Sequence, residues 1–216
     1  MNVEVVRPPS GVRADSGQSH QSIERLALDF RRRIASDVPL DEALPGWQLF
    51  DRVDKLAVAG DSVRLEAAVE DLPEGIEGLT RYDMRRNSII ISLPKKGYGD
   101  LERDNARARF SLAHELGHAV LHCGVLMREG AVAHQMSALR RGEPLFHSKC
   151  EDTEWQANSF ASAFLMPAIG LATLEKRGAP FPLDTGTVAT VFKTSATAAA
   201  YRIANFRIRR VKLLDT

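Results

Sequence analysis

Two histidines that bracket a glutamate are the residues in this sequence whose types and spacing best support chemistry. They stand in the run His114-Glu115-Leu116-Gly117-His118. On a helix, positions i and i+4 differ by about 40° in azimuth and about 6 Å along the axis, so both imidazoles project from one face and can bind one cation. We expect His114 and His118 to be metal ligands. Glu115, one residue further round the helix, is placed to reach a water bound to that metal and is the expected catalytic base.

The chemistry that this arrangement predicts is hydrolysis. Zinc accepts imidazole nitrogen, prefers four ligands and lowers the pKa of a bound water to about 7. Glu115 would take the proton of that water as it attacks a carbonyl group. One zinc ion is the expected cofactor, although the spacing does not distinguish zinc from manganese or iron. The alternative is a solvated helix face without a metal, but the run FSLAHELGHAVLH is apolar, which favours the metal.

A third ligand is expected from a second helix, predicted over 153–166. Glu154 and Asn158 lie on one stripe of this helix, followed by small residues that let two helices pack closely. We expect Glu154 to be the third metal ligand and Asn158 to orient it. Glu151 and Asp152 are the alternatives. For all three acids, an ordinary role in the first turn of a helix is the competing interpretation.

Other residues near this motif have weaker assignments. His122 continues the stripe, but it lies about 12 Å along the axis from His114, so a role at the helix end is favoured over metal binding. Cys123 is expected to be a small buried residue rather than a ligand. A donor for the transition-state oxyanion is needed besides the metal. Its candidates are Tyr82, Tyr98, His134 and His147.

Hydrophobic periodicity predicts the elements that must hold these residues. Apolar residues at helical spacing predict helices over 22–35, 47–58, 104–122, 153–166, 183–192 and 196–208. Alternating or β-branched runs predict three strands, over 63–69, 78–82 and 88–93. The fold class is therefore α+β, with a short three-stranded sheet packed on helices. Residues 124–150 are predicted to be irregular and too long for a plain connector.

Strand 88–93, which precedes the histidine helix, has two interpretations. It is either an edge strand that pairs with an extended substrate backbone or a core strand. For Ile89 and Ile91 the core is favoured.

The composition excludes several classes of protein. Of the 216 residues, 44% are hydrophobic and 26% are charged, which excludes fibrous and wholly disordered chains. The net charge of +1 means that any binding to nucleic acid or membrane must be local. Two cysteines are too few for a disulfide framework, and no apolar run approaches the roughly 20 residues of a membrane span. We expect a cytoplasmic protein that does not associate with membranes.

Two blocks of the sequence resemble the ImmA/IrrE family of bacterial metallopeptidases. One is Arg109 to His118, with Leu121-His122 after it, and the other is Glu154 to Ala161, ending in Leu165-Met166-Pro167. Residues 191–203 are similar to the helix-turn-helix-like segment that usually follows in this family. The likeness covers roughly residues 20–210.

The resemblance implies an organisation and an activity. It implies a zincin-like metallopeptidase domain over 20–170, after a loose tail over 1–19, and a helix-turn-helix-like helical segment over 171–216. The family's carboxylate ligand corresponds to Glu154, because position 156, often acidic in relatives, is glutamine here. Family members cut helix-turn-helix repressors of the Xre type, so the implied function is a zinc-dependent endopeptidase that cleaves such a regulatory protein.

A basic C-terminus leaves a second function open. Six basic residues lie between position 193 and the end of the chain: Lys193, Arg202, Arg207, Arg209, Arg210 and Lys212. They could contact DNA phosphates or an acidic face of the repressor, but a solvated helix face is favoured. The alternative function is a non-catalytic, metal-stabilised regulator that binds a repressor or DNA. A zinc hydrolase of small molecules is a weaker third alternative.

Overall fold

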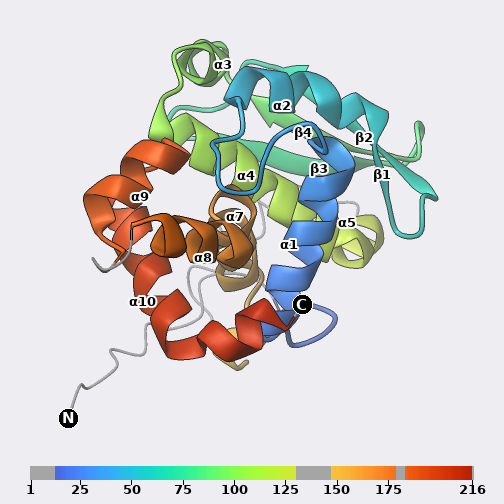
Figure 1. Ribbon diagram of the computed structural model, residues 1–216. Coiled ribbons are helices and arrows are strands. Elements are labelled where there is room, and N and C mark those ends of the chain that lie inside the picture. Colours follow the sequence, from blue (N-terminus) through green and yellow to red (C-terminus); the bar gives the residue numbers. More distant parts are fainter. Residues whose placement is uncertain (1–12, 130–146, 179–182, 216) are drawn as a thin grey trace.

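The computed structural model describes residues 13–129, 147–178 and 183–215 (Figure 1). The fold is α+β, as predicted, and helices make up most of the described chain. The helices are α1 (His20–Ile34), α2 (Gly46–Arg52), α3 (Lys95–Glu102), α4 (Ala106–Leu121), α5 (Cys123–Glu129), α7 (Thr153–Leu165), α8 (Ala168–Arg177), α9 (Thr185–Phe192) and α10 (Ala196–Leu214). The strands are β1 (Ala57–Val58), β2 (Val63–Val69), β3 (Leu79–Asp83) and β4 (Ser88–Leu93), and two short 3-10 turns are η1 (Val53–Lys55) and η2 (Lys149–Glu151).

The sheet has four strands rather than the three that were predicted. Its order is β1-β2-β4-β3, with β2 and β4 parallel and both outer pairs antiparallel. The additional strand, β1, lies where the prediction of a helix over 47–58 was wrong. Helix α2 ends at Arg52, and positive φ angles at residues 59–61 turn the chain back, so that β1 pairs with the start of β2. A strand of two residues is too short to have a recognisable period.

Strand β4 is a core strand and not an edge. It is paired with β2 on one side and with β3 on the other, and all six of its residues are buried. Ile89 and Ile91 are fully enclosed, because a strand that is covered on both faces reads as a continuous apolar run. Strands β1 and β3 are the two edges of the sheet, and β3 also contacts α4.

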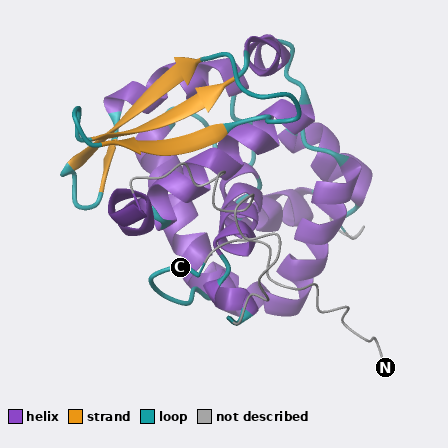
Figure 2. Cartoon of the chain, turned by 180° about the vertical axis from the view of Figure 1, so that it is seen from behind, coloured by secondary structure: helices purple, strands orange, loops and turns teal. Residues whose placement is uncertain are grey.

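The helices pack against the sheet at one corner of the molecule. Seen from behind, the sheet lies in front of the helices (Figure 2). Helix α4 contacts β3 and β4, and its most extensive packing is with α7. Leu112 and Leu116 from α4 and Phe160 and Phe164 from α7 are enclosed in one hydrophobic core. The two helices that carry the candidate site therefore lie at the centre of the fold.

The C-terminal helices are packed on this body. Helices α9 and α10 follow the predicted pattern, with Lys193 in the left-handed conformation between them; α8 was not predicted, and α10 extends beyond 208 to Leu214. Arg202 on α10 forms a buried ion pair with Glu24 on α1 at 2.6 Å and donates to the carbonyl of Met166 at 2.8 Å. The core includes residues from both sides of the predicted boundary between 170 and 171.

The first described residues form backbone hydrogen bonds with η2, which precedes α7. The backbone N–H of Ala14 donates to the carbonyl of Glu151 at 2.7 Å, and that of Gln18 donates to the carbonyl of Cys150 at 2.8 Å. The rest of the predicted tail, residues 1–12, lies outside the described residues. The stretch predicted as irregular begins with α5 and ends with η2, and its central part, 130–146, also lies outside the described residues.

Within the described ranges, no single helix is both long and apolar enough to cross a membrane; only α7 and α8 taken together, bent by 41° at their junction, reach that length and hydropathy.

Candidate metal centre

Three side chains from two helices converge at one point. His114 and His118 lie one turn apart on α4, and their Nε2 atoms are 3.0 Å apart. Glu154 lies in the first turn of α7, and its Oε2 is 3.3 Å from Nε2 of His114 while its Oε1 is 3.3 Å from Nε2 of His118. The three ligand atoms all lie within 4.8 Å of one another. The structure thus brings together the three residues that the sequence nominated as metal ligands, and we refer to them as the His/His/Glu cluster.

A close crossing of α4 and α7 sets the distance between the histidines and the glutamate. A Cβ atom on Gly117 would lie 3.0 Å from the Cα of Ala157 and 3.1 Å from its carbonyl oxygen. Glycine is needed here because the two backbones touch. The start of α7 is capped by Asp152, whose side chain accepts a hydrogen bond from the backbone N–H of Trp155 at 2.7 Å. Glu154 therefore projects from a fixed first turn.

A chain of hydrogen bonds fixes the orientation of the His118 ring. The side-chain amide of Gln156 donates to the carbonyls of Ser16 and Cys150, at 2.9 and 2.7 Å. Its oxygen therefore faces His122 and accepts from Nε2–H of that ring at 3.0 Å. The Nδ1 of His122 must then accept from Nδ1–H of His118, also at 3.0 Å. As a result the Nε2 of His118 keeps its lone pair, which faces the cluster.

The second imidazole is oriented in a similar way. The Oδ1 of Asn158 lies 3.2 Å from the Nδ1 of His114, so this nitrogen donates and Nε2 keeps the lone pair. Two imidazole lone pairs and a carboxylate oxygen thus share one small space. That is the donor set that Zn²⁺ accepts with three protein ligands and one further position for water. The residues present therefore fit the metal that the sequence predicts, and Asn158 orients a histidine rather than Glu154.

Glu154 and His114 of the cluster stabilise each other's charged forms. Burial alone would raise the pKa of Glu154, but its hydrogen bonds with His114 and His118 outweigh burial and hold the pKa well below its usual range. Burial lowers the pKa of His114, whereas Glu154 and Glu115 act in the opposite direction and raise it above its ordinary value. Burial also lowers the pKa of His122, to about 3, so this ring is neutral.

Glu115 lies beside the cluster without joining it. Its charge acts on His114, but its carboxylate is not one of the three converging ligand atoms. The hydroxyl of Thr80, on the edge strand β3, lies 2.7 Å from Oε2 of Glu115 and 3.0 Å from its carbonyl oxygen. Gly78, just before β3, packs directly against the glutamate side chain. Glu115 is therefore held from the side of the sheet and not by the metal ligands.

The other nominated residues do not join the cluster. Glu151 accepts hydrogen bonds from Ser148 and Arg13, which lower its pKa to about 2. Asp152 is the cap of α7. His122 is a partner of His118 and not a helix-end cation.

The described candidates for the oxyanion donor contact residues outside the cluster. Tyr82 donates to Asn87 at 2.9 Å, Tyr98 packs on Phe50, and His147 lies 3.4 Å from Asp152. His134 lies outside the described residues. The sequence reasoning missed Gly78, Thr80 and Gln156, whose roles depend on contacts between distant segments.

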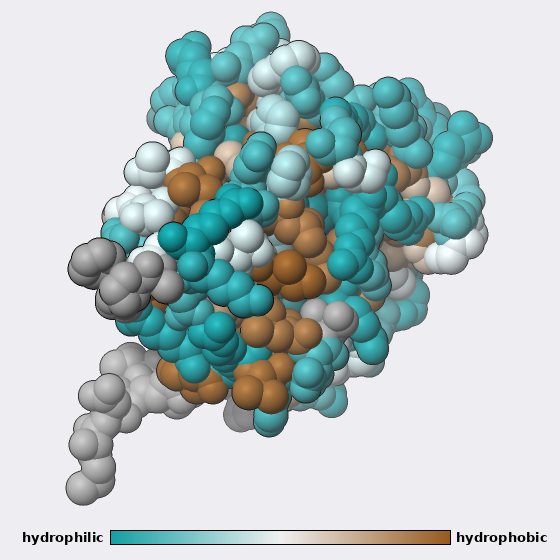
Figure 3. All heavy atoms as spheres, in the orientation of Figure 1, coloured by the Kyte–Doolittle hydropathy of each residue, from teal (hydrophilic) through white to brown (hydrophobic). Residues whose placement is uncertain are grey.

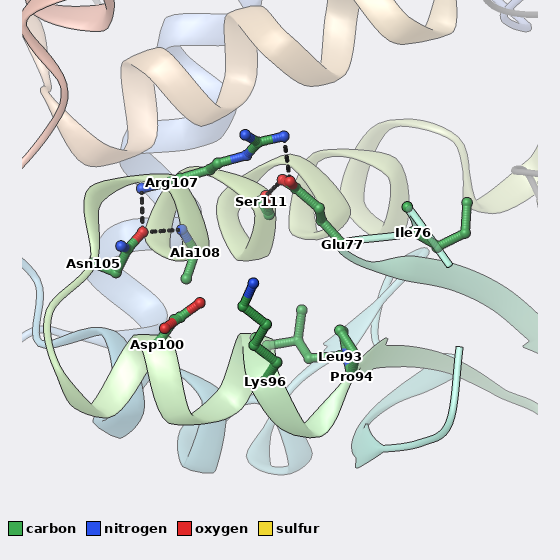
Figure 4. Close-up of a pocket in the computed structure, with 12 residues that line it drawn as sticks. Ile76, Glu77, Leu93, Pro94, Lys96, Asp100, Asn105, Arg107, Ala108 and Ser111 are labelled. Carbon is green, nitrogen blue, oxygen red and sulfur yellow. Dashed lines mark hydrogen bonds and ion pairs between the residues drawn. The ribbon is translucent and has the colours of Figure 1, made fainter. Parts of the chain in front are cut away.

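A cavity of about 470 Å³ lies between α3 and the start of α4 (Figure 4). Lys96 and Asp100 point into it from α3, opposite Asn105, which caps α4 by accepting from the backbone N–H groups of residues 107 and 108. Arg107 forms an ion pair with Glu77, and Ser111 donates to the same carboxylate at 2.9 Å. These three residues line both this cavity and a larger groove.

A small α+β domain with two helical histidines and a glutamate of this geometry is typical of metal-dependent peptidases. Residues 102–204 match the model of the family described as the IrrE N-terminal-like domain, peptidase M78. This match confirms the resemblance to the ImmA/IrrE family that the sequence predicted, and this family is typically metal-dependent. The matched stretch contains all of the His/His/Glu cluster and Glu115.

Comparison with solved structures gives a more distant likeness. A Mycobacterium tuberculosis transcriptional regulator matches with 13% sequence identity and a TM-score of 0.40. The match covers 85% of this chain but 50% of that chain, so this protein spans half the length of the regulator. Comparison with the curated proteins gives no match.

Proposed function

We propose that the protein is a zinc-dependent endopeptidase that cleaves a regulatory protein, namely a helix-turn-helix repressor of the Xre type. The observation that carries the proposal is the convergence of three metal-ligating atoms beside Glu115, within the stretch that matches a peptidase family. His114, His118 and Glu154 would hold the metal. The repressor as substrate comes from the family resemblance, and the large groove beside the cluster is consistent with a polypeptide substrate.

Each residue beside the cluster has a role in the proposed reaction. Zinc, when bound, polarises the scissile carbonyl group and lowers the pKa of the attacking water. Glu115 accepts a proton from this water and later donates it to the nitrogen of the leaving amine. Thr80 and Gly78 position the Glu115 carboxylate for both transfers. His122 and Asn158 keep the two imidazoles turned toward the metal.

The positive charge of the C-terminal segment is reduced by ion pairs within the protein. Arg202 is buried against Glu24, Lys193 is paired with Asp104, and Arg210 is paired with Glu175. Three of the six cations in the C-terminal segment are thus neutralised within the protein. A surface that binds DNA phosphates needs cations that are free to contact them.

The test is a substitution that removes the base and retains the metal. Glu115→Gln should keep zinc, measured by elemental analysis, and should lower cleavage of a co-expressed Xre-type repressor by about a hundredfold or more. His114→Ala should lose both zinc and cleavage. Glu102→Gln, an exposed glutamate at the end of α3, is the matched control and should be unaffected. Undiminished cleavage by Glu115→Gln would refute the mechanism, and an unchanged regulatory output would favour the non-catalytic alternative.

A further inference from the structure

A large groove lies beside the His/His/Glu cluster, and we refer to it as the α10 groove. It has a volume of about 790 Å³ and is bounded mainly by α4, α7 and α10. Its lining includes Asn158, the partner of His114, and Ser111, one helical turn before Glu115. A chain lying in the groove would therefore contact a residue that is hydrogen-bonded to the cluster.

One wall of the groove is an exposed apolar face of α10. Tyr201 and Ile208 line the groove and are 66% and 76% exposed, and Val211, 75% exposed, continues the same face. With Ala204 these residues repeat at helical spacing. In the face shown in Figure 3, hydrophobic side chains gather near the centre and lower edge, where Figure 1 places α8 and α10. Neighbouring apolar side chains exposed to water are typical of interaction sites.

The groove also carries positive charge that the described residues do not neutralise. Two of its basic side chains are paired with carboxylates, as Arg107–Glu77 and Arg202–Glu24. The other two, Lys149 and Arg209, form no ion pair with any residue in the described part of the chain. Arg209 donates instead to the neutral amide of Asn205 at 2.8 Å. The groove therefore has the charge that attracts a carboxylate.

A titratable group inside the groove responds to this charge. His20 lines the groove and stacks edge-on against Trp155, with ring centroids 5.1 Å apart. Burial, followed by the charges of Arg209, Arg202 and Lys149, lowers the pKa of His20 to about 4. The charges of Arg209, Arg202 and Lys149 thus act on a residue that lines the groove.

We propose that the α10 groove binds a stretch of the polypeptide substrate in which apolar side chains stand next to acidic ones. The apolar side chains would pack on Tyr201 and Ile208, and the carboxylates would pair with Lys149 and Arg209. This inference rests on the proposed function and adds the feature by which the site selects its substrate. Because Asn158, the partner of His114, lines the groove, a segment bound there would lie close to the cluster.

Two short fluorescein-labelled peptides test the proposal. Both alternate leucine and tyrosine with a charged residue, which is glutamate in one peptide and lysine in the other. Binding is measured by fluorescence anisotropy with zinc-loaded Glu115→Gln protein, so that no peptide is cut. We expect the acidic peptide to bind at least about tenfold more tightly than the basic one, with an affinity that falls as salt rises.

Variants of the groove locate the binding. The double variant Lys149→Glu with Arg209→Glu should weaken binding of the acidic peptide about tenfold or more. The double variant Tyr201→Ser with Ile208→Ser should weaken the binding of both peptides. Arg85→Glu, an exposed charge reversal in the turn between β3 and β4, is the control and should leave binding unchanged. Circular dichroism establishes that each variant is folded.

Several outcomes would overturn the proposal. Equal binding of the two peptides, or binding that the groove variants leave intact, would remove the groove from substrate selection. If duplex DNA bound in place of the peptides, the positive charge of the groove would serve to bind nucleic acid. A change of oligomeric state on Tyr201→Ser with Ile208→Ser, measured by light scattering, with peptide affinity unchanged would assign the apolar face to a second copy of the chain. Because every arm uses the Glu115→Gln protein, failure here is distinguishable from failure of the cleavage test.

Discussion

Gly78 lies so close to Glu115 that a Cβ atom on the glycine would be 2.7 Å from the Cγ of the glutamate and 3.1 Å from its Oε1. An alanine at this position must therefore push the glutamate side chain aside. We predict that Gly78→Ala lowers the rate of substrate cleavage by about a hundredfold, because the proposed base is moved away from the water it deprotonates. The measurement is cleavage rate together with zinc content, which should stay normal.

The matched control is Gly99→Ala, on α3. A Cβ atom there would be 3.7 Å from the nearest atom, which belongs to the flexible side chain of Arg103. The control should retain its cleavage rate. An equal loss of rate in both variants would mean that the close approach of Gly78 to Glu115 is not what matters.

The hydrogen bonds from Gln156 through His122 to His118 give a prediction about metal affinity. Gln156→Leu removes the acceptor that fixes the proton of His122, so His118 no longer has a single orientation and tautomer. We predict that the affinity for zinc falls about tenfold to a hundredfold. It is measured by competition with a coloured chelator at fixed pH.

The conservative variant separates this role from simple packing. Gln156→Glu keeps an oxygen acceptor for His122 but loses the amide hydrogens that Gln156 donates to Ser16 and Cys150. It should retain more zinc affinity than Gln156→Leu. The opposite ranking would show that the bonds to the backbone carbonyls, and not the orientation of His122, support the site.

His20 gives a prediction about pH. The pKa of His20 is lowered from 6.5 to about 4 in the folded protein, so the unfolded chain binds a proton more readily. Stability contributed by neutral His20 is therefore present above pH 6.5 and is lost as the pH falls from 6.5 toward about 4. His20→Gln should lose less stability than the wild type between these values. Urea unfolding at neutral pH and at pH about 5 measures the difference, and equal losses would contradict the assignment.

The buried ion pair between Glu24 and Arg202 should be essential for folding. Arg202→Met leaves the carboxylate of Glu24 buried without its partner, and we predict a loss of about 3–5 kcal/mol in the free energy of unfolding. Arg210→Met is the control on the same helix, because the pair of Arg210 with Glu175 is partly exposed. It should cost about 1 kcal/mol or less. Similar losses for both variants, measured by denaturant unfolding, would contradict the prediction.

The residues of the candidate site were predictable where their relationship is local in the sequence. His114 and His118 share a helix face because of their spacing, and Glu154 lies in the first turn of a helix whose small residues allow close packing. The run of isoleucines in β4 likewise indicates a buried strand. In each case the pattern itself contains the physical constraint.

The remaining features depend on contacts between distant segments. Thr80 bonds to Glu115 across 35 positions, and Gln156 bonds to His122 across 34; no periodicity within one element indicates such pairs. Helix α3 was missed for a different reason, because the glycines at 97 and 99 are typical of turns.

The crossing of α4 and α7 at Gly117 and Ala157 has a consequence for how the protein would respond to metal supply. The residues of the His/His/Glu cluster are held by two helices that pack closely in the hydrophobic core. They do not lie on loops that would need an ion to become ordered. The protein without metal would therefore keep the arrangement of its three ligand residues. Under the proposed function, a cell starved of zinc would hold an intact but inactive protein, which would regain its activity when zinc binds again.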